Sequence, residues 1–141
     1  MASGFDAIFM GIGAWKDASL RVEGEDLKGC YTGIDFLSRL ASGETFPLGR
    51  TAAIIGGGNT AVDVARSLIR LGAAPIIVYR RRQADMPAFA DEIQMAKDEG
   101  VQIRELAVPV QMESDGRDIL VTLQGMKVAP GKTKNGRAQV V

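Results

Sequence analysis

The sequence has no histidine and only one cysteine, Cys30. Without histidine, Ser-His-Asp and Cys-His catalytic arrangements are excluded, and so is most zinc chemistry. A single cysteine forms neither a disulfide within the chain nor the cysteine cluster that zinc or an iron–sulfur centre requires. Because no histidine is present to activate it, Cys30 is interpreted as a small apolar residue rather than a nucleophile.

An excess of charge of one sign is also missing. The 141 residues include 17 Lys+Arg and 17 Asp+Glu, so the formal net charge is zero. This balance produces no overall field toward nucleic acid or a membrane surface, and neither is expected as a partner. No apolar run reaches the length of a membrane span, and the first residues lack the basic segment of a signal peptide. We therefore expect a cytoplasmic protein of one domain's length.

The middle of the sequence has the pattern of a βαβ unit. Residues 52–55 are all apolar, which is typical of a strand buried in a parallel sheet. A glycine-rich turn follows, then an amphipathic helical run that ends near Gly72, and then a second apolar strand over residues 76–79. This order predicts two parallel strands and an α/β, Rossmann-like nucleotide-binding fold.

The flanking segments are expected to complete this fold. The predicted elements are a strand over 5–10, a helix over 34–40, a helix over 88–99 with Phe89, Ile93 and Ala96 on its apolar face, and a strand over 101–103. The C-terminal part predicts a small antiparallel β meander, with strands over 108–114 and 119–124, a third strand from Met126, and a polar tail.

The turn after the first strand of the βαβ unit matches the dinucleotide-binding fingerprint G-x-G-x-x-G/A through Gly56, Gly58 and Ala61. Gly56 permits a tight turn, and Gly58 has no side chain to keep a diphosphate away from the main chain. Ala61 allows the helix to pack closely on the strand.

The start of the helix adds donors to this loop. Its free N–H groups and positive dipole end favour a phosphate. Gly57 belongs to the same loop, and Asn59 and Thr60 are placed either to cap the helix or to bind the phosphates. The alternative interpretation is a glycine-rich turn that binds no ligand.

Basic residues follow the second strand, where Tyr79 is succeeded by Arg80, Arg81 and Arg82. An NAD-binding fold usually has Asp or Glu at this position, about twenty residues after the glycines, to bind the ribose hydroxyls. A carboxylate would repel a 2′-phosphate, whereas guanidinium groups bind it. The arginines therefore favour NADP over NAD; the alternative is a solvated basic run or a contact with a partner.

Three stretches together resemble one family of proteins: GGGNTAVDVARSLIRLGA, VYRRR and MPAFADEIQMAKDEGV. They are similar to the NADPH-binding domain of the glutamate synthase small (beta) subunit and its relatives, among them dihydropyrimidine dehydrogenase and NADPH-linked subunits of bacterial electron-transfer flavoproteins. The segment FDAIFMGIGAWKDASLRVEGEDLKGCYTGIDFL resembles the connection from the FAD domain into the NADPH domain. The resemblance extends from Phe5 to about Val128.

The resemblance implies a flavin-dependent oxidoreductase. In this family NADPH reduces an FAD that a separate domain holds, and electrons then pass through iron–sulfur clusters to a partner such as the glutamate synthase large subunit. By the family's motifs, the pyrophosphate is held by Gly56, Gly58, Asn59, Thr60 and Ala61, the 2′-phosphate by Arg80 and Arg81, and Gly11 and Gly13 lie beside the flavin.

The FAD fingerprint, the cluster-binding cysteines and the C-terminal flavin segment of this family are missing from the sequence. Residues 1–49 are thus expected to be a connecting segment from the FAD domain and residues 50–141 the NADPH-binding domain, the whole being one compact excised domain. Such a chain would bind NADPH but not turn over alone. Its expected partners are the missing FAD domain and the large subunit or another electron-accepting subunit. The alternatives are an electron-bifurcating or dihydropyrimidine dehydrogenase-like sibling, a nucleotide- or S-adenosylmethionine-dependent transferase, and a non-catalytic docking domain.

Overall fold

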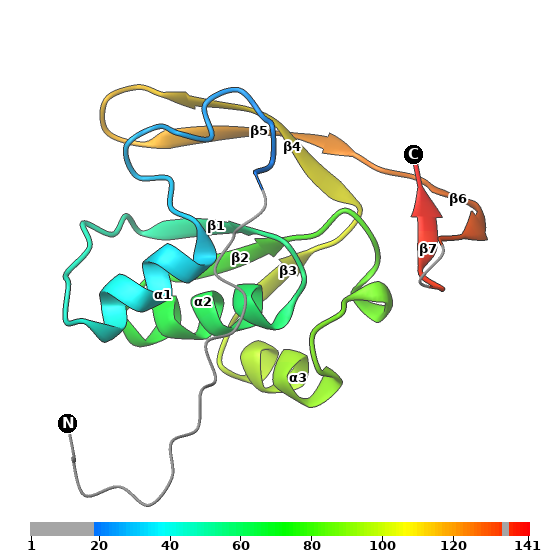
Figure 1. Ribbon diagram of the computed structural model, residues 1–141, viewed down its shortest axis with the longest axis horizontal. Coiled ribbons are helices and arrows are strands. Elements are labelled where there is room, and N and C mark those ends of the chain that lie inside the picture. The colour runs from blue at the N-terminus through cyan, green and yellow to red at the C-terminus, as the bar shows by residue number, and fades with distance from the viewer. Residues whose placement is uncertain (1–18, 134–135) are drawn as a thin grey trace, which may run out of the picture.

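A parallel sheet forms the centre of the protein (Figure 1), for which a computed structural model describes residues 19–133 and 136–141. The strands β1 (Thr51–Ile55), β2 (Ala74–Val78) and β3 (Gln102–Arg104) are ordered β1-β2-β3. The register pairs Ile55 with Val78, so β1 and β2 end side by side. The predicted α/β class and parallel βαβ unit are confirmed.

Three helices lie on one side of this sheet (Figure 1). They are α1 (Gly33–Ala41), α2 (Asn59–Arg70) and α3 (Ala90–Asp98). The central helix, α2, packs on β1 and β2 and has α1 and α3 as neighbours. The core forms where α2 meets the sheet, because Val62 and Ala65 of the helix and Ile77 of β2 are almost fully buried.

A hairpin of β4 (Ala107–Ser114) and β5 (Ile119–Gly125) lies on the other side of the sheet (Figure 1). Residues of the three sheet strands and of β5, such as Ile76 and Val121, line a half-open cavity of about 530 Å³ between the two layers. The antiparallel pairing of β4 with β5 confirms the two strands and the connecting turn predicted for this hairpin.

The third strand predicted from Met126 is present, but the predicted meander is wrong in how this strand pairs. The third strand, β6 (Val128–Lys132), pairs with β7 (Ala138–Val140) instead of β5, which leaves two separate hairpins. The chain leaves the first hairpin where the Met126 N–H donates to the Leu106 carbonyl. The main chains of Lys127 and Val141 then exchange two hydrogen bonds, so the apolar end of the tail supplies the partner strand.

The predicted apolar face of α3 is correct for Ile93 and Ala96, which are 5% and 1% exposed. It is wrong for Phe89, which is 63% exposed and precedes the helix as its N-cap residue. Helical periodicity predicted that this side chain belongs to the core, but Phe89 precedes the first helical turn, where the main chain is still extended and the helical spacing does not apply. The strand expected over residues 5–10 lies outside the described residues.

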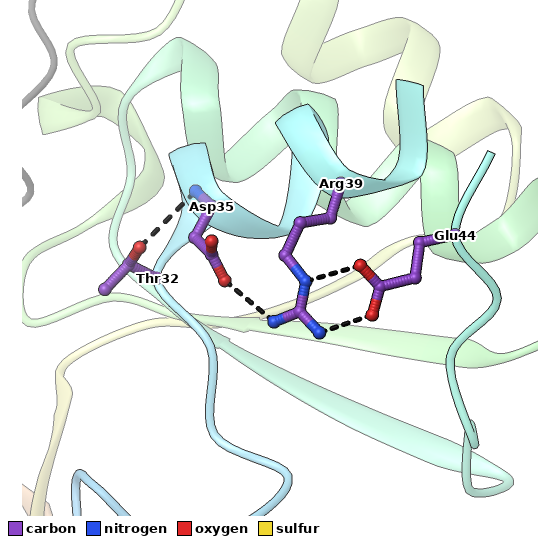
Figure 2. A network of polar contacts seen from close by, with 4 residues as sticks. All are labelled: Thr32, Asp35, Arg39 and Glu44. Carbon is purple, nitrogen blue, oxygen red and sulfur yellow. Dashed lines mark hydrogen bonds and ion pairs between the residues drawn. The ribbon is translucent and has the colours of Figure 1, made fainter. Parts of the chain in front are cut away.

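An exposed ionic network holds α1 to the segment that leads into β1 (Figure 2). Thr32 caps the helix by accepting a hydrogen bond from the Asp35 N–H at 3.4 Å. Arg39 binds Asp35 at 3.1 Å and both carboxylate oxygens of Glu44, and its guanidinium lies over the ring of Phe46. Because a guanidinium fork matches a carboxylate geometrically, this network fixes where α1 ends.

A second ionic contact joins α2 to the end of α3. Arg66 donates to both carboxylate oxygens of Glu99, at 2.6–3.0 Å. The hydrogen bond from Arg66 lowers the pKa of Glu99 below its ordinary value of 4.5. A carboxyl group whose pKa is lowered on folding adds stability above its unfolded pKa and loses it as the pH falls.

We expect Glu99→Gln to lower the thermal unfolding midpoint at neutral pH and to make it less sensitive to acid. The difference from the unsubstituted chain should shrink as the pH falls from neutral to about 3, because Glu99 itself becomes protonated. Thermal unfolding followed by circular dichroism across this range measures the effect. Glu113→Gln, at an exposed position of β4, is the control. A difference independent of pH would contradict the assignment.

Candidate functional site

The glycine-rich turn is an elbow between β1 and α2, held at the carboxyl end of the sheet. The Gly56 N–H donates to the Val78 carbonyl of the neighbouring strand at 3.1 Å. Gly56 has φ +143°, a conformation that L side chains rarely adopt. A Cβ atom on Gly56 would lie 3.7 Å from that of buried Ala61, so the elbow and the helix start are in close contact.

The surface of the elbow at Gly58 is open. Gly58 is the N-cap of α2, and a Cβ atom placed on it would meet no atom within 4 Å. Among the residues that the structure describes, none accepts a hydrogen bond from the main-chain N–H of Gly57, Gly58, Asn59 or Thr60. The first turn of α2 carries no acidic residue, so the positive end of its dipole is not neutralised locally. The arrangement suits an anion that approaches the main chain closely.

Gly57 faces inward, where it is packed against the segment after β2. A Cβ atom on Gly57 would lie 2.7 Å from two ring carbons of Tyr79 and 3.1 Å from Met86 Cγ. The Tyr79 hydroxyl donates to the Asp85 carbonyl at 2.9 Å, and the Ala88 N–H donates to the Gly57 carbonyl at 3.2 Å. Gly57 is therefore required by close packing, while Gly58 is required by nothing in the described structure.

The Asn59 side chain bonds to the segment before α3 rather than to the start of α2. Its Oδ1 accepts a hydrogen bond from the Phe89 N–H at 3.0 Å, and no side chain caps α2. The expectation that Asn59 caps the helix is therefore wrong: its side chain ties the segment before α3 to the elbow. Thr60 is exposed and borders α1, since a Cβ atom on Gly33 would lie 2.9 Å from its methyl group.

The three arginines after β2 differ in their surroundings. Arg80 and Arg82 are exposed, and no hydrogen bond or ion pair joins either side chain to another described residue. Arg81 is 8% exposed, and its Nε donates to the Ala138 carbonyl at 2.8 Å. Because β1 and β2 end together, this segment and the glycine elbow lie at the same edge of the sheet.

Sequence reasoning missed the contacts that join these two segments. Tyr79 was considered only as the end of a strand, yet its ring packs on Gly57. Asp85 lies in the short segment between β2 and α3, and its carboxylate accepts a hydrogen bond from the Ala138 N–H at 2.9 Å. The partners in these contacts, Gly57 for Tyr79 and Ala138 for Asp85, lie far away in the sequence. The order of residues after β2 was therefore the only sequence signal for them.

The remaining candidate residues lie away from the elbow or outside the described part of the chain. Gly11 and Gly13, expected beside the flavin, lie outside the described residues. Cys30 is partly buried beside Met112, and burial raises the pKa of its thiol. Within residues 19–133 and 136–141, no group of three or more His, Cys, Asp or Glu side chains is placed to hold a metal ion. No helix in this part of the chain is both long and apolar enough to cross a membrane.

Comparison with known proteins identifies the class. The chain matches the pyridine nucleotide-disulphide oxidoreductase family over residues 2–137 and belongs to this family. Membership of this family does not favour the alternatives of a transferase or a non-catalytic docking domain.

Curated relatives agree with the family. The chain is 35% identical over 135 residues to the NADPH-Fe(3+) oxidoreductase subunit beta of Geobacter sulfurreducens, covering 91% of this chain and 20% of the relative. It is 32% identical over 128 residues to the glutamate synthase [NADPH] small chain of Escherichia coli K12, covering 82% and 27%. The chain thus spans about a fifth to a quarter of the length of these relatives.

Solved structures share the fold. Mycobacterium tuberculosis FprA in complex with NADPH has a TM-score of 0.72 and 19% identity, covering 92% of this chain and 44% of FprA. The thioredoxin reductase of Lactococcus lactis has a TM-score of 0.61 and 24% identity, covering 89% and 38%. At these identities the likeness shows the fold alone.

Proposed function

We propose that this chain is the NADPH-binding domain of a flavin-dependent oxidoreductase of the glutamate synthase small-subunit type. The observation that carries the proposal is the open elbow at Gly58, where main-chain N–H groups that no described residue pairs begin a helix whose first turn has no acidic residue. The relatives named above are NADPH-dependent by their names, which supports the choice of cofactor.

The residues of the elbow fit a dinucleotide diphosphate. The main-chain N–H groups from Gly57 to Thr60 would donate to its oxygens, and the space above Gly58 would admit them. Ala61 keeps the helix start close to the turn. Asn59 acts indirectly, because its side chain holds the segment at Phe89 against the elbow.

The arginines after β2 would recognise the 2′-phosphate that distinguishes NADPH from NADH. Arg80 is exposed and joined to no other described residue, so its whole guanidinium fork remains to bind a phosphate. Arg81 uses only Nε in its bond to Ala138, and no described residue accepts from its two terminal nitrogens. Neither position offers the carboxylate that would repel this phosphate.

Bound NADPH would supply a hydride to an FAD carried elsewhere in the full-length protein, and onward electron transfer would serve the large subunit or another acceptor. This chain's residues bind and orient the nucleotide. Residues 1–49, including Gly11 and Gly13, would lead to the FAD-binding part. A sibling that serves a different electron acceptor is the alternative.

Titration of the 141-residue chain with NADPH and with NADH tests the proposal. We expect NADPH to bind at least about tenfold more tightly, because charge-assisted hydrogen bonds to the 2′-phosphate each contribute about 1.5–3 kcal/mol. Nicotinamide fluorescence or calorimetry gives both dissociation constants. Equal affinity for the two nucleotides would refute the phosphate role of Arg80 and Arg81, and binding of neither would refute the site itself.

A further inference from the structure

The C-terminal hairpin, formed by β6 and β7 (Figure 1), contacts the segment after β2 through the main chain of Ala138. The Ala138 carbonyl accepts from Arg81 Nε at 2.8 Å, and the Ala138 N–H donates to Asp85 Oδ1 at 2.9 Å. Both bonds span more than fifty positions of sequence. The main-chain carbonyl and N–H of this one residue of β7 thus bind a basic and an acidic side chain at the same time.

This contact completes the hydrogen bonding of a strand edge. The preceding residue, Arg137, bonds through its carbonyl to the Thr133 N–H at 2.8 Å, within the hairpin. In a β-strand, successive residues direct their main-chain groups to opposite sides, so Ala138 is directed away from β6. There the side chains of Arg81 and Asp85 take the place of a neighbouring strand.

The Arg81 segment is also held from the other side. The Leu106 N–H donates to the Arg81 carbonyl at 3.1 Å, and the Gln83 N–H donates to Glu105 Oε1 at 2.7 Å. Main chain and side chain of Arg81 are therefore both fixed. Asp85 in turn belongs to the short helix η1 (Gln83–Asp85), whose end holds the Tyr79 hydroxyl.

We infer that Asp85 and Ala138 form a latch that orients Arg81 for the 2′-phosphate, so that the C-terminal hairpin sets the preference for NADPH. Asp85 is a positioning residue, because its carboxylate binds the Ala138 N–H and acts on the phosphate only through Arg81. This inference rests on the proposed function: with Nε engaged by Ala138, the terminal nitrogens of Arg81 are presented in one fixed direction. A fixed donor binds a phosphate more tightly than a mobile one, since less side-chain entropy is lost.

The test substitutes Asp85. We expect Asp85→Ala to weaken NADPH binding by about fivefold to tenfold, the equivalent of one lost hydrogen bond, with NADH binding unchanged. Asp85→Asn keeps an oxygen acceptor for the Ala138 N–H and should restore most of the NADPH affinity. Hydrogen exchange of the Ala138 amide, followed by NMR without nucleotide, should be slow in the unsubstituted chain and fast in Asp85→Ala.

Asp115→Ala is the matched control. Asp115 also accepts main-chain hydrogen bonds, from Arg117 and Asp118, but in the β4–β5 turn. It should leave both nucleotide affinities unchanged. An unsubstituted chain without NADPH preference would overturn the proposed function. A preference that survives Asp85→Ala, an equal loss of NADPH and NADH affinity, or fast exchange at Ala138 in the unsubstituted chain would overturn the latch alone.

Discussion

Gly58→Asp is expected to abolish nucleotide binding while leaving the protein at least as stable as before. Gly58 has φ −86° and ψ 175°, which any residue adopts, and a new side chain would extend into open space. Aspartate is a better N-cap than glycine and favours the helix dipole, so we expect a gain of about 0.5–1 kcal/mol in the free energy of unfolding. The same carboxylate would occupy the place of the diphosphate and repel it.

Titration with NADPH and NADH, together with thermal unfolding, measures both effects. Gly125→Asp adds the same charge at an open position of β5 and should leave binding intact. Gly57→Ala should instead lower the free energy of unfolding. Its Cβ atom would lie 2.7 Å from the Tyr79 ring, so overpacking should cost about 1–3 kcal/mol of stability. Undiminished nucleotide binding by the Gly58→Asp variant would show that the elbow is not the site.

Arg80→Glu is expected to reverse the nucleotide preference. The substitution removes an exposed guanidinium and places a carboxylate where NAD-binding folds have one. We expect NADPH affinity to fall about a hundredfold or more, from lost charge-assisted hydrogen bonds and added repulsion. NADH affinity should be unchanged or higher, because a carboxylate accepts hydrogen bonds from the ribose hydroxyls.

Separate dissociation constants for the two nucleotides check this result. Arg117→Glu makes the same change of charge in the exposed β4–β5 turn, and it should alter neither affinity beyond a weak salt-dependent effect. If Arg80→Glu lowers both affinities equally, Arg80 does not recognise the 2′-phosphate. The loss should also diminish at high salt, because the attraction that it removes is screened.

The parallel unit was predictable because its information is local. Apolar runs mark β1 and β2, the helical period of α2 is regular, and glycines stand at both ends of that helix. Gly72, with φ +85°, ends α2 as its place in the sequence predicted. The β4–β5 hairpin was predictable for the same reason, since its turn and alternation lie within one short stretch.

The errors arose where partners are far apart in sequence. The pairing of β6 depends on residues 138–140 at the end of the given sequence, and no residue near Met126 predicts this pairing. The environment of Phe89 depends on Asn59, thirty residues earlier. Similarly, Gly57 and Gly58 look alike in the sequence, and only the position of the Tyr79 ring distinguishes a packing requirement from an open surface.

The class of the fold, the glycine elbow and the run of arginines beside it follow from the amino-acid sequence, because hydrophobic period, glycine placement and charge are properties of short segments. How those parts differ in use follows only from the folded chain. It buried Arg81 against Ala138 and left Arg80 exposed, and it engaged Asn59 with Phe89 while leaving the Gly58 surface free. These differences depend on which main-chain groups from distant parts of the sequence lie next to each side chain. Only the packing of the folded chain determines those neighbours.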